Sequence, residues 1–436
     1  MNTNSLRPLI SIVIPTRDRP DYVAFCLNCL AKQTFTNFEV IVSDNFKNLS
    51  CKKVLDRYTG DKRFHYYTPP QQLSMCDNWD FVLSKAQGEY VTLISEKYMF
   101  RPDALATLHR VLQSHPAELV SWWNETLMVN EFSDQVFSGN YVPNFKPKVA
   151  EYFCPIEVLQ QRFSFEIPPY SRSLGPSECY GKIYSGCYHR NLISRIIKQH
   201  GRVFSPISPD ITSMIAALSL ARTCLDLGQP LVLACTSANV STGYQCMVNT
   251  ASIKEYFASF SEQEIRPYLS KTPLENLWVG ITNGVARDYC VIQSQSSEPR
   301  LKNIPINRIN LLIRAKEDLD KVIIWANDDE KHELHQTWLN LLNECTETDK
   351  DYIYQQLAEK QVVTPSKHEI FFAGGIKEAT YMHKLSAKRR AEINWLENKV
   401  FRIKDEFLYY ETLEQAMDYF SEYYQHSNQL LGIEWK

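Results

Sequence analysis

The chain has 436 residues, of which 44% are hydrophobic and 22% are charged. This length predicts about two to three domains, and this composition excludes an intrinsically disordered protein, which has fewer apolar residues and a larger charge imbalance. The 47 basic and 50 acidic residues give a net charge of −3, so the total charge does not indicate binding to nucleic acid or to anionic lipid.

The cysteines and the apolar runs give no sign of secretion or of membrane insertion. The 12 cysteines are scattered, and a chain of this length can bury a core without disulfides. Cys26 and Cys29 form the one CxxC motif, but they fall within a predicted helix, so we interpret them as small buried side chains. Residues 1–8 lack the apolar run of a signal peptide, and no run approaches the ~20 residues of a membrane helix. We therefore expect a reduced, cytoplasmic protein with no integral membrane segment.

The first part of the chain alternates between predicted strands and predicted helices. Strands are expected at residues 9–14, 39–43, 64–67 and 90–95, and helices from Pro20 onward and at residues 52–58, 77–86 and 102–113. Such alternation indicates βαβ units, which form a mostly parallel sheet with helices on both faces. The predicted fold class is therefore α/β.

Polar or charged residues directly follow three of these predicted strands. They are Thr16-Arg17-Asp18, Asp44-Asn45 and Ser95-Glu96-Lys97. Because ligands of open parallel sheets bind outside the carboxyl ends of the strands, we expect these three segments to converge on one binding site.

The rest of the chain has a looser pattern. Prolines between Val129 and Pro176 indicate loops and short strands, residues 183–197 return to regular structure, and residues 209–227 and 231–235 read as a helix and a strand. Residues 294–305 are a predicted linker, and residues 316–424 are predicted to be mostly charged helix, interrupted at Gly374-Gly375.

Several short motifs follow one another along the first part of the chain. They are SIVIPTRDR at residues 11–19, QTF at 33–35, FEVIVSDN at 38–45, NW at 78–79, AQGEYV at 86–91 and PDAL at 102–105. Together they resemble the inverting family-2 glycosyltransferases over residues 9–125, and more loosely to residue 245. The resemblance implies a GT-A (nucleotide-diphospho-sugar transferase) catalytic domain at residues 1–245. We expect a helical connection at residues 246–294 and a mainly helical accessory region of unknown role at residues 295–436.

The resemblance also implies which residues hold the donor nucleotide. Pro15, Thr16 and Asp18 follow the first strand, where the family holds the base and the ribose. Asp44 matches the acid that hydrogen-bonds the base, because a carboxylate accepts a hydrogen bond from a base N–H. Asn45, next to it, and Asn78 complete this predicted donor site. A turn or a helix cap is the structural alternative for Asp44-Asn45, a turn for Thr16, and a cap or packing for Asn78.

The chain departs from the family where an Asp-x-Asp-type cluster normally binds Mg²⁺ or Mn²⁺. Glu96 keeps one carboxylate and is the candidate metal ligand, but Lys97 stands where a second carboxylate is expected. A cation there repels a divalent metal, yet it can stabilise the departing diphosphate directly. Two interpretations stay open: an active enzyme whose dependence on a divalent cation is weakened or lost, or a degenerate site that binds without turnover. A solvated loop is the structural alternative for Glu96 and Lys97.

Inverting transfer requires a carboxylate that takes the proton of the acceptor hydroxyl. Residues 184–190, followed by Ser208-Pro209-Asp210, resemble the distal half of the family domain, and Asp210 is the predicted base. Its structural alternative is an acid that favours a helix N-terminus, a role compatible with catalysis. Glu178 is the reserve base, and His189 is a candidate for contact with phosphate or acceptor, with packing as the alternative.

The remaining side chains carry weaker signals. Trp79, Trp122 and Trp123 either stack on a sugar or fill the core, and the core is the more common role. A basic run at residues 384–390 is either a solvated helix face or a contact with anionic lipid.

The function that the resemblance implies is an inverting glycosyltransferase of the hexosyltransferase type (EC 2.4). It moves a sugar from a nucleotide-diphosphate donor to a hydroxyl acceptor on a sugar, a lipid-linked glycan or a protein, in polysaccharide or glycoconjugate biosynthesis. The alternative is a catalytically degenerate nucleotide-sugar-binding or scaffold protein on the same fold. We expect no nucleic-acid partner, and a cytoplasmic location that allows a peripheral position at the inner face of the membrane.

Overall fold

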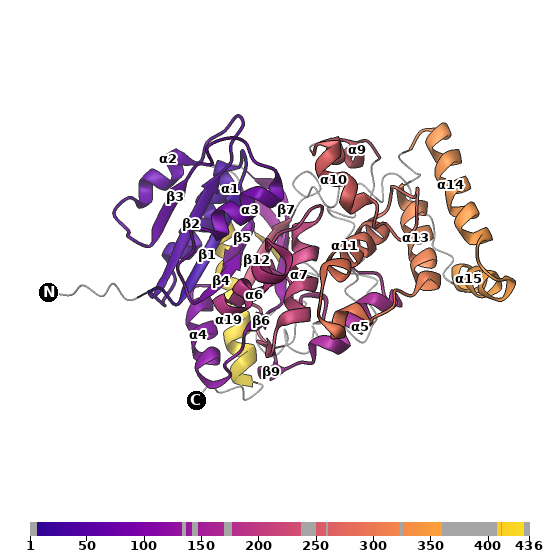
Figure 1. Cartoon of the computed structure of the whole chain (residues 1–436). Coiled ribbons are helices and arrows are strands. Elements are labelled where there is room, and N and C mark those ends of the chain that lie inside the picture. The colour runs from indigo at the N-terminus through magenta and orange to yellow at the C-terminus, as the bar shows by residue number, and fades with distance from the viewer. Residues whose placement is uncertain are drawn as a thin grey trace.

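The computed structural model describes residues 7–132, 137–141, 147–169, 177–236, 250–258, 260–322, 326–359, 408–410 and 412–430. Figure 1 shows that the first half of the chain forms a part built around β-sheets, whereas helices from residue 308 onward lie at the opposite side of the molecule. The last described helix returns to the sheets.

An eight-stranded sheet forms the centre of the first part. In spatial order its strands are β3 (Phe64–Tyr67), β2 (Phe38–Asp44), β1 (Ile10–Thr16), β4 (Tyr90–Leu93), β10 (Gly186–His189), β6 (Leu119–Ser121), β11 (Cys224–Asp226) and β9 (Glu151–Tyr152). The pairs β1–β2, β1–β4, β2–β3 and β6–β11 are parallel, whereas β10 and β9 run antiparallel to their neighbours. The predicted α/β class with a mostly parallel sheet is therefore confirmed.

Helices cover both faces of this sheet and continue beyond it. The α-helices are α1 (Pro20–Ala31), α2 (Lys52–Leu55), α3 (Met75–Leu83), α4 (Ala104–Ser114), α5 (Pro155–Ser164), α6 (Arg190–His200), α7 (Pro209–Leu220), α9 (Thr250–Ala258), α10 (Glu262–Leu269), α11 (Ile281–Gln295), α12 (Pro299–Lys302), α13 (Arg308–Val322), α14 (Asp328–Asn343), α15 (Glu347–Glu359) and α19 (Leu413–Leu430). Two 3-10 helices, η1 (Asp56–Tyr58) and η3 (Ile183–Ser185), complete the helical elements of the described residues.

Alternate residues of the central strands point to opposite faces and enter two separate cores. Val13 and Ile41 pack with helices α3, α5, α6, α7 and α11, whereas Ile14 and Val42 pack with α1, α2, α4 and α19. Because both faces are covered, every residue of β1 and β2 is buried, which explains why most of their residues are apolar and β-branched.

A second, five-stranded sheet was not predicted from the sequence. Its spatial order is β13 (Leu408–Tyr410), β8 (Phe137–Tyr141), β7 (Asn124–Phe132), β12 (Val232–Thr236) and β5 (Tyr98–Phe100). Strand β13 brings residues from the end of the chain to the edge of this sheet, where it pairs with β8. Helix α19 then buries Phe420 and Tyr424 in the same core as α4, and the Arg101 guanidinium lies 5.8 Å from the Phe420 ring centroid.

Some predicted boundaries are wrong. The helix expected at residues 209–227 ends at Leu220, and Cys224–Asp226 forms strand β11 instead. The expected linker at residues 294–305 contains the end of α11 and the short helix α12. A helical C-terminal region is confirmed for the described residues, whereas Gly374-Gly375 and the basic run at residues 384–390 lie outside them. The division of the chain at residues 245 and 294 stays a prediction.

Within the described part, no helix combines the length and the apolar character that a membrane span requires.

Candidate functional site

The carboxyl ends of β1 and β2 lie side by side and carry two of the predicted donor residues. Thr16 pairs with Asp44 at the last position of the parallel register. Both residues are buried, with Thr16 3% and Asp44 0% exposed.

Asp44 has one oxygen that the protein satisfies and one that it does not. Its Oδ2 atom accepts hydrogen bonds from the Ser50 hydroxyl (2.9 Å), the Cys51 backbone N–H (2.8 Å) and the Tyr66 hydroxyl (2.8 Å). Its Oδ1 atom is buried and has no hydrogen-bond partner among the described residues, whereas the buried Thr16 hydroxyl interacts with the Cys51 thiol. A buried polar atom without a partner is unfavourable, by about 1–3 kcal/mol, so the Asp44 Oδ1 atom suits a ligand that donates a hydrogen bond.

The other predicted donor residues already have partners inside the protein. Asp18 adopts a positive φ of 56°, and its Oδ1 atom accepts the backbone N–H groups of residues 47, 48 and 49 at 2.7–2.9 Å. The Asn45 side chain makes two hydrogen bonds with the Leu73 backbone, at 2.9 and 3.0 Å. Asn78 accepts from the Ser43 hydroxyl at 2.6 Å, and Pro15 is buried within β1. In this structure Asp18, Asn45 and Asn78 therefore shape the loops and the helix around the strand ends.

Glu96, which follows β4, lies against an arginine that the sequence analysis did not single out. The Arg19 guanidinium is 2.8 Å from Glu96 Oε1, and the Ser95 hydroxyl donates to Glu96 Oε2 at 3.3 Å. The neighbouring Lys97 is half-buried. Burial lowers the pKa of Lys97, the Glu96 carboxylate opposes this change, and the Arg19 guanidinium adds to it. The end of β4 thus holds one carboxylate and two cations.

Cys51 shows that the ends of β2 and β4 share one electrostatic environment. Burial raises the pKa of its thiol to about 12, and the carboxylates of Asp44 and Glu96 both add to this increase. Since both carboxylates act on the same side chain, Asp44 and Glu96 both lie near Cys51.

Asp210, the predicted base, occupies the first turn of α7. Burial raises the pKa of Asp210, Lys182 opposes this increase, and Asp288 adds to it. Asp288, on α11, is fully buried and accepts the backbone N–H of Ser208 at 3.1 Å. Asp288 on α11 therefore anchors Ser208, the residue directly before α7, and so helps to position Asp210 in the first turn of that helix.

Glu178, the reserve base, forms an ion pair with the same Lys182. Burial by itself would raise the pKa of Glu178, but Lys182 and Arg162 bring it below the ordinary value of a glutamate. The two candidate bases therefore differ: Asp210 has the raised pKa that general-base catalysis near neutral pH favours, whereas Glu178 is held in its ionised form.

Tyr98 connects the end of β4 with these two acids. It directly follows Lys97, and its ring meets the Tyr184 ring edge-on at a centroid distance of 6.0 Å. Burial raises the pKa of Tyr98, and the nearby Cys179, Glu178 and Asp210 add to this increase. Arg19, Lys182 and Tyr98 are residues near the candidate site that the sequence analysis missed. Arg19 ends the SIVIPTRDR motif but was given no role there, and Lys182 and Tyr98 belong to no motif.

Comparison with known proteins shows what this part of the chain is. Residues 11–154 match the family model described as "Glycosyl transferase family 2". This chain contains a family-2 glycosyltransferase domain. Its mostly parallel sheet with helices on both faces has the α/β class that the sequence predicts.

Two curated proteins resemble this domain. Glycosyltransferase GlyG of Streptococcus pneumoniae serotype 4 is 25% identical over 113 residues, which cover 26% of this chain and 38% of GlyG. Protein CgeD of Bacillus subtilis is 22% identical over 135 residues, which cover 29% of this chain and 32% of CgeD. The matched segments thus span only about a third of either relative.

Solved structures with a similar arrangement include Staphylococcus aureus TarS residues 1–349 in complex with UDP-GlcNAc. It has 13% sequence identity and a TM-score of 0.45, covering 93% of this chain and 97% of that one. The mannosyltransferase PcManGT from Pyrobaculum calidifontis, in complex with GDP-Man and Mn²⁺, has 12% identity and a TM-score of 0.41, covering 90% of this chain and 88% of that one.

The residues of this family-2 domain do not fit the divalent cation that the family implies. Both oxygens of Glu96 already have partners, a guanidinium and a hydroxyl. Within the described residues, no three His, Cys, Asp or Glu side chains form a group suited to a metal ion. A cation at Glu96 has to share this carboxylate with Arg19 and is repelled by the charges of Arg19 and Lys97.

The aromatic candidates and His189 have partners that place them in the scaffold of the domain. His189 caps α6 by accepting the Asn191 N–H at 3.2 Å, and its ring meets the Tyr90 ring at 5.1 Å. Trp122 and Trp123 are 1% and 8% exposed, and Trp79 packs edge-on against Phe204. These contacts agree with the packing roles that the sequence analysis kept as alternatives.

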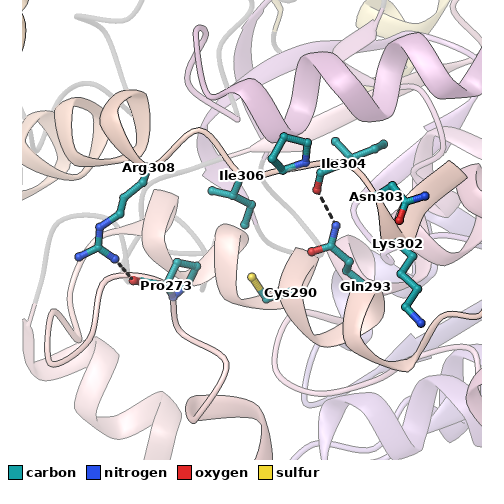
Figure 2. Close-up of a pocket in the computed structure, with 9 residues that line it drawn as sticks. Pro273, Cys290, Gln293, Lys302, Asn303, Ile304, Ile306 and Arg308 are labelled. Carbon is teal, nitrogen blue, oxygen red and sulfur yellow. Dashed lines mark hydrogen bonds between the residues drawn. The ribbon is translucent and has the colours of Figure 1, made fainter. Parts of the chain in front are cut away.

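A separate pocket lies in the helical region between α11, α12 and α13 (Figure 2). Its lining includes Cys290, Lys302 and Arg308 but none of the predicted site residues. Figure 2 shows that Gln293 donates to the Ile304 carbonyl, at 2.7 Å, and that Arg308 donates to the Pro273 carbonyl, at 2.9 Å. The side chains of Gln293 and Arg308 therefore form hydrogen bonds within the helical region.

Proposed function

We propose that this protein is an inverting glycosyltransferase that moves a sugar from a nucleotide-diphosphate donor to a hydroxyl acceptor. The observation that carries this proposal is the buried Oδ1 atom of Asp44, which has no hydrogen-bond partner among the described residues and belongs to the residue that pairs in register with Thr16. Both lie at adjoining strand ends of a family-2 glycosyltransferase domain, where the ligands of parallel sheets bind.

The Asp44 carboxylate is suited to bind the base of the donor. Its Oδ2 atom is fixed by three hydrogen bonds from the protein, so its Oδ1 atom is held in place before a ligand arrives. An N–H group of a nucleobase can donate to this oxygen, and the bond compensates for the desolvation of the buried oxygen. Thr16, one strand away, offers a hydroxyl that both donates and accepts.

Asp210 takes the proton of the acceptor hydroxyl in this proposal. As the proton leaves, the acceptor oxygen attacks the anomeric carbon, and the bond from that carbon to the diphosphate oxygen breaks. One displacement inverts the configuration at the anomeric carbon and needs no covalent intermediate on the enzyme. The raised pKa of Asp210 suits this role, because a general base works best with a pKa near the working pH.

The acceptor is a hydroxyl of a sugar, a lipid-linked glycan or a protein, and the product belongs to a polysaccharide or a glycoconjugate. The name of GlyG as a glycosyltransferase supports the reaction class, although the match covers 38% of that protein. One observation favours a second function, a nucleotide-sugar-binding protein without turnover: Arg19 and Ser95 engage the carboxylate at the family's usual metal position.

An activity assay separates the two functions. The full-length protein is incubated with UDP-, GDP- and dTDP-sugars, each with EDTA and with Mn²⁺, and the released nucleoside diphosphate is measured. Binding of each donor is measured by calorimetry. We expect release from at least one donor, and an inverted anomeric configuration by NMR of the product. Binding without release supports the binding protein, and no binding of any donor overturns both functions.

An Asp210→Asn variant tests the assignment of the base. We expect turnover to fall by about 10²- to 10⁴-fold while donor affinity stays unchanged, since the proton transfer is lost but the donor contacts remain. Asp56→Asn, at a surface acid paired with Lys52, is the matched control and is expected to keep full activity. Full activity in Asp210→Asn excludes this residue as the base.

A further inference from the structure

Helix α11, which packs against α7, carries a buried ion pair. Arg287 is 5% and Asp288 0% exposed, and two nitrogens of the Arg287 guanidinium lie 2.8 Å from Asp288 Oδ1. Because the removal of two charges from water offsets most of their attraction, a buried ion pair contributes little to stability. Stability alone therefore does not explain why these two charges are buried beside α7.

The second oxygen of Asp288 binds the backbone directly before the proposed base. Its Oδ2 atom accepts the N–H of Ser208, the N-cap of α7, and Asp210 lies two positions later in the first turn of that helix. From α9, the Tyr256 hydroxyl donates to the Ile207 carbonyl at 2.7 Å. Two helices of the predicted connection at residues 246–294 thus hold the backbone that leads into Asp210.

Asp288 also acts on Asp210 through its charge. Burial raises the pKa of Asp210 most, Lys182 lowers it, and Asp288 raises it further. Lys182 is paired with Glu178, and Asp288 is paired with Arg287. The charge on Asp210 therefore depends on two ion pairs that act in opposite directions.

The other ionisable groups around Asp210 are neutral or bound elsewhere. Burial raises the pKa values of the tyrosines that feel its charge, so they stay neutral: Tyr98, Tyr188, Tyr256 and Tyr289. Three more elements pack against α7. Arg162 of α5 donates to backbone carbonyls of residues 169, 177 and 178, Arg195 of α6 pairs with Glu118, and Tyr184 of η3 packs against the Tyr98 ring.

We propose that Asp288, held by Arg287, is a positioning residue for the base: it fixes the start of α7, and with it the Asp210 carboxylate, and its charge favours proton uptake by Asp210. This inference rests on the proposed function, because it extends the assignment of Asp210 as the base. Asp288 is fully buried and acts only through Asp210. Helix α11 then takes part in the reaction through the backbone that it holds.

Two substitutions of Asp288 separate its hydrogen bond from its charge. Asp288→Ala removes both, so kcat is expected to fall by about 10- to 100-fold while donor affinity stays unchanged. Asp288→Asn keeps an oxygen for the Ser208 N–H but removes the charge, so the pKa of Asp210 falls. We expect Asp288→Asn to keep most of the wild-type kcat and to move the acidic limb of kcat/KM to lower pH. Released nucleoside diphosphate measures turnover, and calorimetry measures donor affinity.

Asp318→Asn is the matched control. Asp318, on α13, is 7% exposed and accepts the backbone N–H of Thr282, in the first turn of α11, at 2.8 Å. It is therefore also a buried acid that holds the start of a helix. We expect Asp318→Asn to lower the melting temperature and to leave the acidic limb in place. Thermal melting of every variant shows whether it folds.

The possible failures are distinguishable. If no donor turns over in the wild-type protein, the proposed function is wrong and the inference falls with it. If the wild-type protein is active but a folded Asp288→Ala variant keeps its kcat, or Asp288→Asn loses as much kcat as Asp288→Ala, the inference alone is wrong. An acidic limb that stays in place in Asp288→Asn, or that moves equally in Asp318→Asn, also overturns it. Where Asp288→Ala does not fold, the pH profile of Asp288→Asn decides.

Discussion

Tyr424 in the C-terminal helix α19 donates its hydroxyl hydrogen to the fully buried carboxylate of Glu125 on β7, 299 positions earlier in the chain. A hydrogen bond to a buried charged group contributes about 1.5–3 kcal/mol to stability. We therefore expect Tyr424→Phe, which removes only the hydroxyl, to lower the free energy of unfolding by about this amount. Chemical denaturation of the full-length protein measures the change.

Tyr354→Phe is the control for this prediction. Tyr354 lies on α15 and is 52% exposed, so the loss of its hydroxyl is expected to change the free energy of unfolding by less than about 0.5 kcal/mol. Equal stability of Tyr424→Phe and Tyr354→Phe would show that α19 does not contribute to the stability of the sheets through this contact.

Gly88 allows β1 and the turn before β4 to approach closely. A Cβ atom at this position would lie 2.6 Å from both the backbone nitrogen and the hydroxyl oxygen of Ser11. The Gly88 N–H also donates to that hydroxyl at 2.7 Å, so neither group can move without loss of the bond. We expect Gly88→Ala to destabilise the protein by about 1–3 kcal/mol, as overpacking of a tight site does, with thermal melting as the measurement.

Gly60→Ala is the matched substitution, because a Cβ atom at Gly60 meets no atom within 4 Å. Its melting temperature is expected to stay near that of the wild-type protein. A similar loss of stability in both variants would mean that the steric conflict at Gly88 is not the cause.

The sequence predicts β1 and β2 well because each is mostly apolar and β-branched and ends at a polar residue. Strand β3 has the predicted bounds, and β1 and β2 differ from theirs by one or two residues. The second sheet could not be predicted, since β5, β12 and β13 pair with strands far away in the sequence and β5 and β13 have only three residues each. Periodicity also fails at Cys224–Asp226, because a short buried run reads equally as strand or helix.

The candidate site, like the fold, could be predicted from the sequence only in part. The strand-end pattern places Thr16 and Asp44 together, and the structure pairs them in register. The Arg19–Glu96 contact joins residues 77 positions apart, and nothing in either local sequence indicates the other. Asp18 follows a strand as a ligand-binding residue does, but its positive φ and its three N–H partners become visible only in three dimensions.

Asp44→Asn tests the contact with the donor base. The substitution replaces a carboxylate by a neutral amide, which forms a weaker hydrogen bond and can turn an NH₂ group toward the donor's own N–H. We expect the affinity for the nucleoside part of the donor to fall by about 10- to 100-fold in calorimetry. Tyr66→Phe removes a partner of the other oxygen of Asp44 and is expected to change this affinity little. A stronger effect of Tyr66→Phe than of Asp44→Asn contradicts the proposed contact.

Lys182 controls the protonation of the proposed base. It is 2% exposed, pairs with Glu178, and holds the pKa of Asp210 below the value that burial and Asp288 would otherwise give. Lys182→Met removes this positive charge, so the pKa of Asp210 rises further and the base is protonated at a higher pH. We therefore expect the acidic limb of the profile of kcat/KM against pH to move to higher pH. Lys182→Arg keeps the charge and is expected to restore the limb toward its wild-type position. If Lys182→Met lowers activity equally at all pH values, Lys182 acts on the structure and not on the proton of Asp210.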